Sequence, residues 1–126
     1  MGKSLTIMEA RKMNTHEIEV DLGKHASQLE KLGMDHADTY HFISTVMNLG
    51  IAFQVLNMGK SLTIMEARKM NTHKIVVDLG KHTSQLEKLG MDHADAYHFI
   101  STVMNLGIAF QEKWDEKLQN ISCKKN

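Results

Sequence analysis

The sequence predicts an all-α protein in which two copies of a small helical-hairpin unit pack into a pseudo-two-fold helical bundle, as a single-chain dimer. Three observations predict this fold. The chain of 126 residues contains no proline, the residue that most strongly breaks helix interiors. Residues 1–54 are repeated at 58–111 with only four differences. Hydrophobic residues make up 42% of the chain and recur at helical spacing, which indicates amphipathic helices with a core.

The repeat defines the organisation of the chain. We expect a first helical repeat at 1–54, a linker at 55–57, a second helical repeat at 58–111, and a helical extension with a polar tail at 112–126. One copy is small for a core of its own, whereas two copies can bury a shared face. A recent gene duplication and a deliberate fusion of a homodimer both explain this pattern. The four differing pairs are Glu17/Lys74, Glu19/Val76, Ala26/Thr83 and Thr39/Ala96.

Two short motifs predict where the first helices of each copy begin. Thr6 with Glu9, and Asn14 with Glu17, have the spacing of capping boxes, in which side chains bind the free amides of a helix start. They predict a short helix near residues 7–13 and a second helix from Thr15. That second helix carries an apolar stripe at Ile18, Leu22, Leu29 and Leu32.

Gly33 is a predicted stop for the second helix, and Asp35 with Asp38 predicts the start of a third, over residues 36–54. The later half of this third helix is apolar on nearly every side, so we expect it to lie centrally against its counterpart. In the second copy the helix is expected to continue past Gln111. The residues expected in the core or interface are Ile18, Leu22, Leu29, Leu32, Tyr40, Ile43, Met47, Phe53, Leu79, Leu86, Leu89, Tyr97, Ile100, Met104, Phe110 and Trp114.

An alternative structure is open for residues 16–22 and 73–79. Ile18, Val20 and Leu22 alternate with polar residues, and the second copy is β-branched at 75–77, a pattern that favours a strand. A strand followed by two helices would give a ribbon-helix-helix-like dimer. The capping motifs favour a helix.

Charge and composition exclude several functions. With 15 basic and 15 acidic side chains the formal net charge is zero, which argues against generic binding to nucleic acid or anionic membranes. The uncharged run at 39–59 contains histidine, asparagine and glutamine, so we expect no membrane span. The lone Cys123 indicates a reducing compartment, here the cytoplasm. No nucleophile, acid–base set or cofactor motif is present, so we expect neither an enzyme nor a bound cofactor.

Two Asp–His pairs raise a metal hypothesis. Asp38 and His41, like Asp95 and His98, are three residues apart and would share a helix face. Two such pairs would suit a dinuclear bundle, but that site also needs carboxylates from other helices. We therefore favour the simpler interpretation, in which the aspartates belong to helix starts and the histidines to polar or interface positions.

Residues 15–32 and 42–51 together resemble the small helical regulatory proteins of lambdoid phages, through their helix-turn-helix of the Cro and lambda-repressor type. Ile18, Leu22, Leu29 and Leu32 match its apolar positions, and Gly23 falls in its turn. Glu19 and Lys24 depart from the small and apolar residues of that motif. The resemblance implies DNA contacts by Ser27, Gln28, Lys31, Ser84, Gln85 and Lys88.

From these features we expect a non-catalytic regulatory or interaction module in which the two repeats pack on each other and bind another macromolecule. We expect a protein partner, and a phage or bacterial origin would fit by analogy. DNA binding through a helix-turn-helix is the alternative, and a metal-binding bundle is the third.

Overall fold

The computed structural model describes residues 4–57 and 72–124, which form helices joined by short turns. In chain order the helices are α1 (Ile7–Lys12), α2 (Thr15–Lys31), α3 (His36–Asn57), α5 (Thr72–Lys88) and α6 (His93–Lys124). The described ranges contain no strand, so the all-α prediction is confirmed. The residues of the second copy that correspond in sequence to α1 fall within 58–71, outside the described part of the chain.

Both predicted capping boxes of the first copy are present. The Thr6 hydroxyl accepts a hydrogen bond from the Glu9 amide at 3.2 Å, and the Glu9 carboxylate accepts one from the Thr6 amide at 3.0 Å. At the start of α2, Asn14 and Glu17 exchange the same pair of bonds at 2.8 and 2.9 Å. These bonds satisfy amides that a helix start otherwise leaves free.

Gly33 ends α2 as the sequence predicts. Its φ is +106°, a left-handed conformation that glycine adopts without steric cost. The Gly33 amide donates to the Glu30 carbonyl at 3.0 Å, and the Met34 amide donates to the Leu29 carbonyl at 3.1 Å. This bonding pattern is a Schellman motif, and it recurs after α5 around Gly90.

The strand alternative for residues 16–22 and 73–79 is wrong, because both segments lie inside α2 and α5. The alternation of Ile18, Val20 and Leu22 is also compatible with a helix, in which Ile18 is buried and Val20 is exposed. The weak preference of β-branched residues for strands is overridden by the packing of the helix face that carries Ile18.

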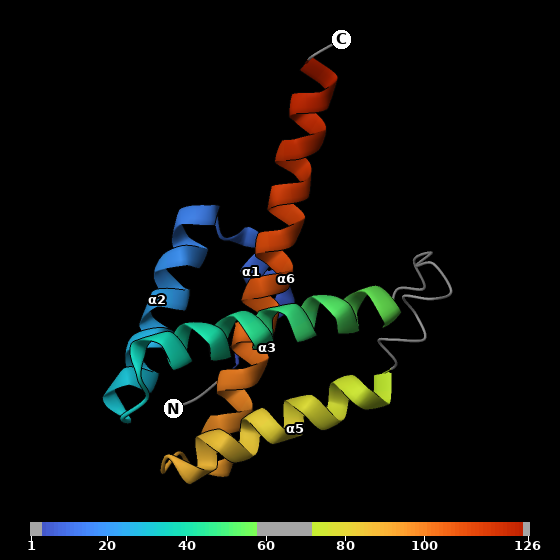
Figure 1. Ribbon diagram of the computed structural model, residues 1–126. Coiled ribbons are helices and arrows are strands. Elements are labelled where there is room, and N and C mark those ends of the chain that lie inside the picture. Colours follow the sequence, from blue (N-terminus) through green and yellow to red (C-terminus); the bar gives the residue numbers. More distant parts are fainter. Residues whose placement is uncertain (1–3, 58–71, 125–126) are drawn as a thin grey trace.

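The most extensive contact between helices is the crossing of α3 over α6, near the centre of the molecule (Figure 1). Two glycines lie at this crossing. A Cβ atom on Gly50 would stand 2.8 Å from Met104 Cβ, and one on Gly107 would stand 2.7 Å from Met47 Cβ. Both distances are shorter than a carbon–carbon contact, about 3.5–4.0 Å, so the close approach requires glycine at both positions.

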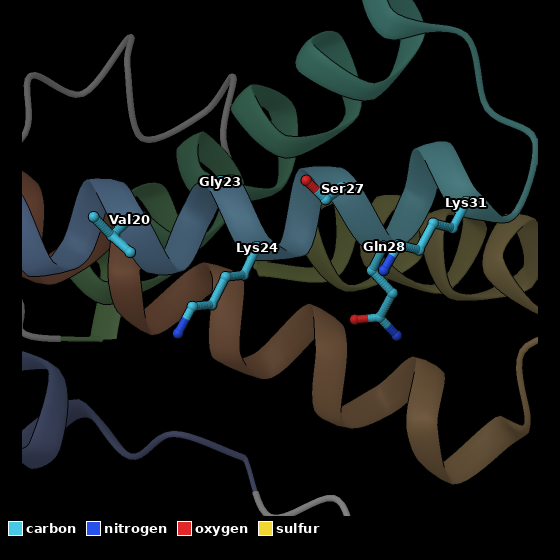
Figure 2. A pocket seen from close by; sticks show the side chains of 6 residues that line it. All are labelled: Val20, Gly23, Lys24, Ser27, Gln28 and Lys31. Carbon is cyan, nitrogen blue, oxygen red and sulfur yellow. The ribbon is translucent and has the colours of Figure 1, made fainter.

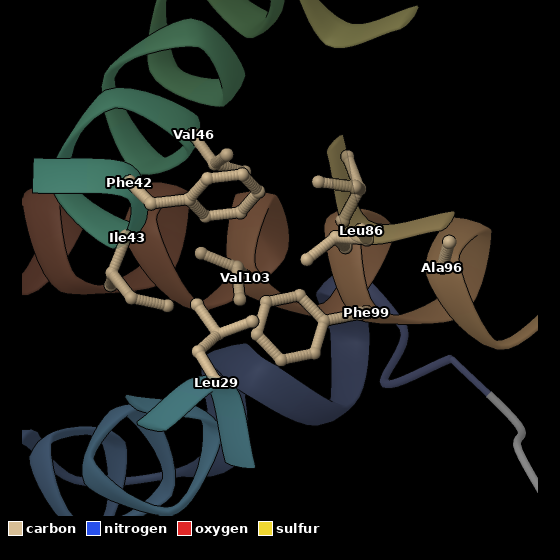
Figure 3. Close-up of a cluster of buried hydrophobic side chains, with 9 residues drawn as sticks. Leu29, Phe42, Ile43, Val46, Leu86, Ala96, Phe99 and Val103 are labelled. Atoms are coloured by element: carbon tan, nitrogen blue, oxygen red, sulfur yellow. The ribbon is translucent and has the colours of Figure 1, made fainter. Parts of the chain in front are cut away.

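The main core lies between α2, α3, α5 and α6 (Figure 3). Four pairs of its residues are 57 positions apart, and Ala96 completes the set. Both copies therefore contribute almost equally to the core. Its buried members are Leu29, Phe42, Ile43, Val46, Leu86, Ala96, Phe99, Ile100 and Val103.

The segment before α1 binds along α6. The Leu5 amide donates to the Thr102 hydroxyl at 3.0 Å, and the Asn105 side-chain amide donates to the Leu5 carbonyl at 2.8 Å. The Arg11 guanidinium donates two hydrogen bonds of 3.0 Å to Glu112, which raise the pKa of Arg11 together with the charge of that carboxylate. This ion pair is partly exposed, so solvent limits its contribution to about 1 kcal/mol or less.

Three residues expected in the core are exposed instead: Tyr40, Tyr97 and Trp114. Each residue turns the side-chain direction by about 100°, and Tyr40 is therefore a quarter turn from the buried face that Thr39 and Ile43 occupy. Tyr97 has the same position on α6. The C-terminal end of α6 projects beyond the other helices (Figure 1). Trp114 lies five residues after the buried Ala109 and is 49% exposed.

The other thirteen residues expected in the core are buried or half-buried. Residues 55–57 form the end of α3, and α6 continues beyond Gln111 to Lys124. Among the helices of the described ranges, none combines the length and apolar character required to cross a lipid bilayer.

Candidate functional site

The outward side of α2 carries a row of exposed residues, here called the α2 face (Figure 2). They recur every three or four positions, which places them on one side of a helix. Ile18 and Leu29, on the other side of α2, are buried, so packing of that side fixes the α2 face toward solvent. The α2 face consists of Val20, Gly23, Lys24, Ser27, Gln28 and Lys31, which line a shallow hollow.

The outward side of α5 carries the same six residue types in the same order, here called the α5 face. All of its residues are exposed, and they line a second hollow. Each member lies 57 positions after its counterpart on α2. The α5 face consists of Val77, Gly80, Lys81, Ser84, Gln85 and Lys88.

All six residues that the helix-turn-helix resemblance singled out lie on these two faces. The turn of that motif is absent at the expected place, however. Gly23 lies in the interior of α2, which runs without interruption from Thr15 to Lys31. The expectation that Gly23 forms the turn was therefore wrong, because glycine at a mid-helix position lowers helix propensity by only about 1 kcal/mol and does not by itself end a helix.

The two faces match in residue type, but the helices that carry them differ in charge near their first turns. Lys74, Lys81 and Lys88 follow at intervals of seven residues, about two helical turns, so they share one side of α5. In α2 the first of these positions is Glu17, whose carboxylate accepts a hydrogen bond from the Asn14 amide. Neither face includes an acidic residue among its six members. Both faces therefore present cationic and neutral polar groups, and the start of α5 adds Lys74 where α2 has Glu17.

Two histidines lie between the copies rather than on these faces. The His25 ring packs edge-on against Phe99 with centroids 5.0 Å apart, and the His82 ring packs against Phe42 at 4.9 Å. Each Nδ1 donates to a carbonyl four residues earlier, at 2.8 Å for His25 and 2.7 Å for His82. Both histidines are half-buried and hydrogen-bonded, as expected of interface residues.

The residues of the metal hypothesis do not gather into a site. Asp38, His41 and Asp95 are exposed. His98 is half-buried, and its Nδ1 lies 2.6 Å from the Ser4 hydroxyl. Within residues 4–57 and 72–124, no group of three or more histidine, cysteine, aspartate or glutamate side chains is placed to hold a metal ion.

Sequence reasoning missed part of the candidate faces. Val20, Lys24 and their counterparts Val77 and Lys81 were not among the predicted contact residues, although they lie one or two turns from those residues on the same side. Lys24 lies three residues before Ser27 and Val20 lies seven before it, and the same spacings recur before Ser84, so helical periodicity was the available signal.

Comparisons with protein-family models, with curated proteins and with solved structures find no match to this chain.

Proposed function

We propose that the chain is a non-catalytic interaction module, a covalently linked pseudo-two-fold dimer of two helical units that binds an acidic protein through the α2 face and the α5 face. The observation that carries this proposal is the duplication of one exposed, acid-free surface on two helices. Two equivalent sites on one chain suit a partner that is itself dimeric or that carries two acidic segments, because binding at the first site raises the effective concentration at the second.

Reciprocal contacts between the copies support the single-chain dimer. In an isologous interface, if one residue contacts a second, the equivalent of the second contacts the equivalent of the first. The contacts across the α3–α6 crossing and around the core follow this rule with an offset of 57 residues. The reciprocal pairs are Gly50–Met104 with Met47–Gly107, and His25–Phe99 with Phe42–His82.

The chemistry of the faces favours a protein over DNA. Val20 and Val77 are 46% and 42% exposed, and an exposed branched apolar side chain beside lysines suits the mixed apolar and charged surface of a protein partner. Duplex recognition depends heavily on phosphate neutralisation, and the chain as a whole carries no net positive charge. DNA remains the second candidate, because all six residues of the helix-turn-helix resemblance are exposed on the two faces.

We expect charge reversal on both faces to abolish partner capture. Immobilised wild-type chain should retain an acidic protein from the source cells, and K31E/K88E should retain at least about tenfold less, because like charges then meet at the interface. The matched control is K12E/K117E, which alters net charge equally at exposed positions outside both faces. Quantitative mass spectrometry of the captured proteins measures the effect.

Equal capture by K31E/K88E and by K12E/K117E would contradict the proposed role of the faces. Titration with a mixed-sequence DNA duplex distinguishes the second candidate. Binding at low salt that weakens steeply as salt rises, and that K31E/K88E removes, would favour DNA over protein. Absence of duplex binding at low salt would exclude it.

The single-chain dimer predicts how one isolated unit behaves. Residues 58–126 alone would expose Phe99, Ile100 and Val103, which the first copy covers. We expect this unit to self-associate and its unfolding midpoint to rise with concentration, whereas the midpoint of the full chain does not change. Analytical ultracentrifugation and thermal unfolding at several concentrations check this. A stable monomer of residues 58–126 would contradict the single-chain dimer.

A further inference from the structure

A hollow of about 440 Å³ lies between α2 and α3 in the first copy, with Phe110 of α6 at its side. We call it the Thr39 groove, after a residue in its wall. Leu22, Ala26, Ile43 and Met47 supply much of the remaining lining. The volume lies within the range of small-molecule sites, about 300–1,000 Å³, and an apolar lining with a few polar groups is typical of them.

Thr39 is the buried polar group of this groove. Its side chain is 1% exposed, and its hydroxyl has no hydrogen-bond partner in the described part of the chain. A buried hydroxyl without a partner is unfavourable, since it has lost its bonds to water. A bound molecule that supplies a hydrogen-bonding group would remove this penalty.

The charges at the groove favour a cation. Glu19 and Glu30 both line it, and no lysine or arginine does. The Glu30 carboxylate is already paired with His36, at 2.7 Å. The Glu19 carboxylate has no hydrogen bond or ion pair within residues 4–57 and 72–124, and the exposed ring of Tyr40 stands in the same lining. A carboxylate attracts an ammonium ion by its charge, and the face of an aromatic ring attracts one through a cation–π contact.

Three of the four positions at which the two copies differ line the groove. Glu19, Ala26 and Thr39 line it, and their counterparts are Val76, Thr83 and Ala96. The second copy therefore has no carboxylate at the position of Glu19. The Thr83 hydroxyl donates to the Leu79 carbonyl at 2.9 Å, and the residue at the Thr39 position is a buried alanine. The unpartnered hydroxyl and the free carboxylate thus belong to the first copy.

We propose that the Thr39 groove binds a small aromatic amine that also carries a hydroxyl group. The ring lies against the apolar wall beside Phe110, the ammonium group lies near Glu19 and Tyr40, and the hydroxyl pairs with Thr39. The chain then carries one ligand site, although its fold contains the same helices twice. This site adjoins the α2 face, with which it shares Gly23, and it has no residue in common with the α5 face.

Tyramine is a suitable probe because it combines all three features, and two analogues each alter one of them. Phenethylamine lacks the phenol, and 3-(4-hydroxyphenyl)propanoate replaces the ammonium with a carboxylate. By titration followed with two-dimensional NMR, we expect tyramine to bind with one site per chain and about fivefold tighter than phenethylamine, for one lost hydrogen bond. We expect the propanoate to bind at least about tenfold more weakly than tyramine, because it faces Glu19.

The decisive variant gives the first copy the residues of the second, E19V/A26T/T39A. The chain already contains each of these residues at the equivalent helix position, and circular dichroism confirms that the variant folds. We expect it to bind tyramine at least about tenfold more weakly. E19V removes the carboxylate charge, T39A removes the hydroxyl, and A26T adds bulk to the wall of the groove. The control V76E/T83A/A96T makes the opposite changes in the second copy and should bind tyramine at least as tightly as the wild type.

Four results would overturn the proposal. They are tight binding by E19V/A26T/T39A, equal binding of tyramine and the propanoate, shifts confined to the α2 and α5 faces, and no tyramine binding at millimolar concentration. Self-association of the chain through the groove, seen as a dimer that E19V/A26T/T39A dissociates, would also overturn it.

Discussion

Replacing both Gly50 and Gly107 with alanine is expected to lower the free energy of unfolding by about 3 kcal/mol, because overpacking at each site costs about 1–3 kcal/mol or more. Alanine favours a helix over glycine by about 1 kcal/mol per site, so helix propensity alone predicts the opposite sign. The new methyl groups would meet Met104 and Met47, including their backbone Cα atoms at 2.9 Å. Backbone cannot rotate aside, so α3 and α6 must separate.

The control for this prediction is G23A/G80A. These glycines lie inside α2 and α5, and an added Cβ there meets no atom within 4 Å. We expect this variant to gain about 1–2 kcal/mol from helix propensity alone. Urea unfolding of both variants measures the difference. Stabilisation by G50A/G107A comparable to that by G23A/G80A would show that the crossing is not close-packed.

Replacing Phe99 with alanine is expected to cost about 3–5 kcal/mol, the range for an aromatic residue removed from a core. Phe99 is 4% exposed, and its ring packs against Phe42 with centroids 6.4 Å apart and against His25 at 5.0 Å. These partners come from α2 and α3, so the cavity would open where both copies meet. Since small domains are stable by about 5–15 kcal/mol, this single change removes a large part of the total.

Tyr97 gives the matched comparison, because it lies two residues away on the same helix and is 61% exposed. We expect Tyr97→Ala to change the free energy of unfolding by no more than about 0.5 kcal/mol. Thermal and urea unfolding measure both variants under the same conditions. A loss for Phe99→Ala as small as that for Tyr97→Ala would contradict the core position of Phe99.

The local motifs of the sequence predicted the helices well. Some features depend only on neighbours within a few residues, so they can be predicted from the local sequence. These are the capping boxes at Thr6 and Asn14 and the helix stop at Gly33. The exposure of Tyr40 and Trp114 was not readable in this way. Tyr40 depends on which side of α3 faces α6, and Trp114 depends on where the partners of α6 end. Both are set by packing between distant segments.

The candidate surfaces also differ in whether local sequence or long-range packing brings their residues together. Ser27, Gln28 and Lys31 were picked out by a motif resemblance and lie together because one helix holds them. The Thr39 groove was not predicted, because Thr39 and Ala26 belong to different helices whose alignment only the packed structure defines. The differences between the copies were visible in the sequence, but nothing in the sequence placed Glu19, Ala26 and Thr39 around one hollow.

The reciprocal crossing at Gly50 and Gly107 also bears on how such a chain tolerates mutation. In an assembly of two identical chains, any change at this glycine would occur twice and strike both contacts at the crossing. In the linked chain, a change at Gly50 meets only Met104 and leaves Gly107 against Met47. A harmful substitution at one of these glycines therefore disrupts one contact at the crossing rather than two. Because both glycines lie in one chain, Gly50 and Gly107 can change independently, and the two repeats can carry different residues at equivalent positions.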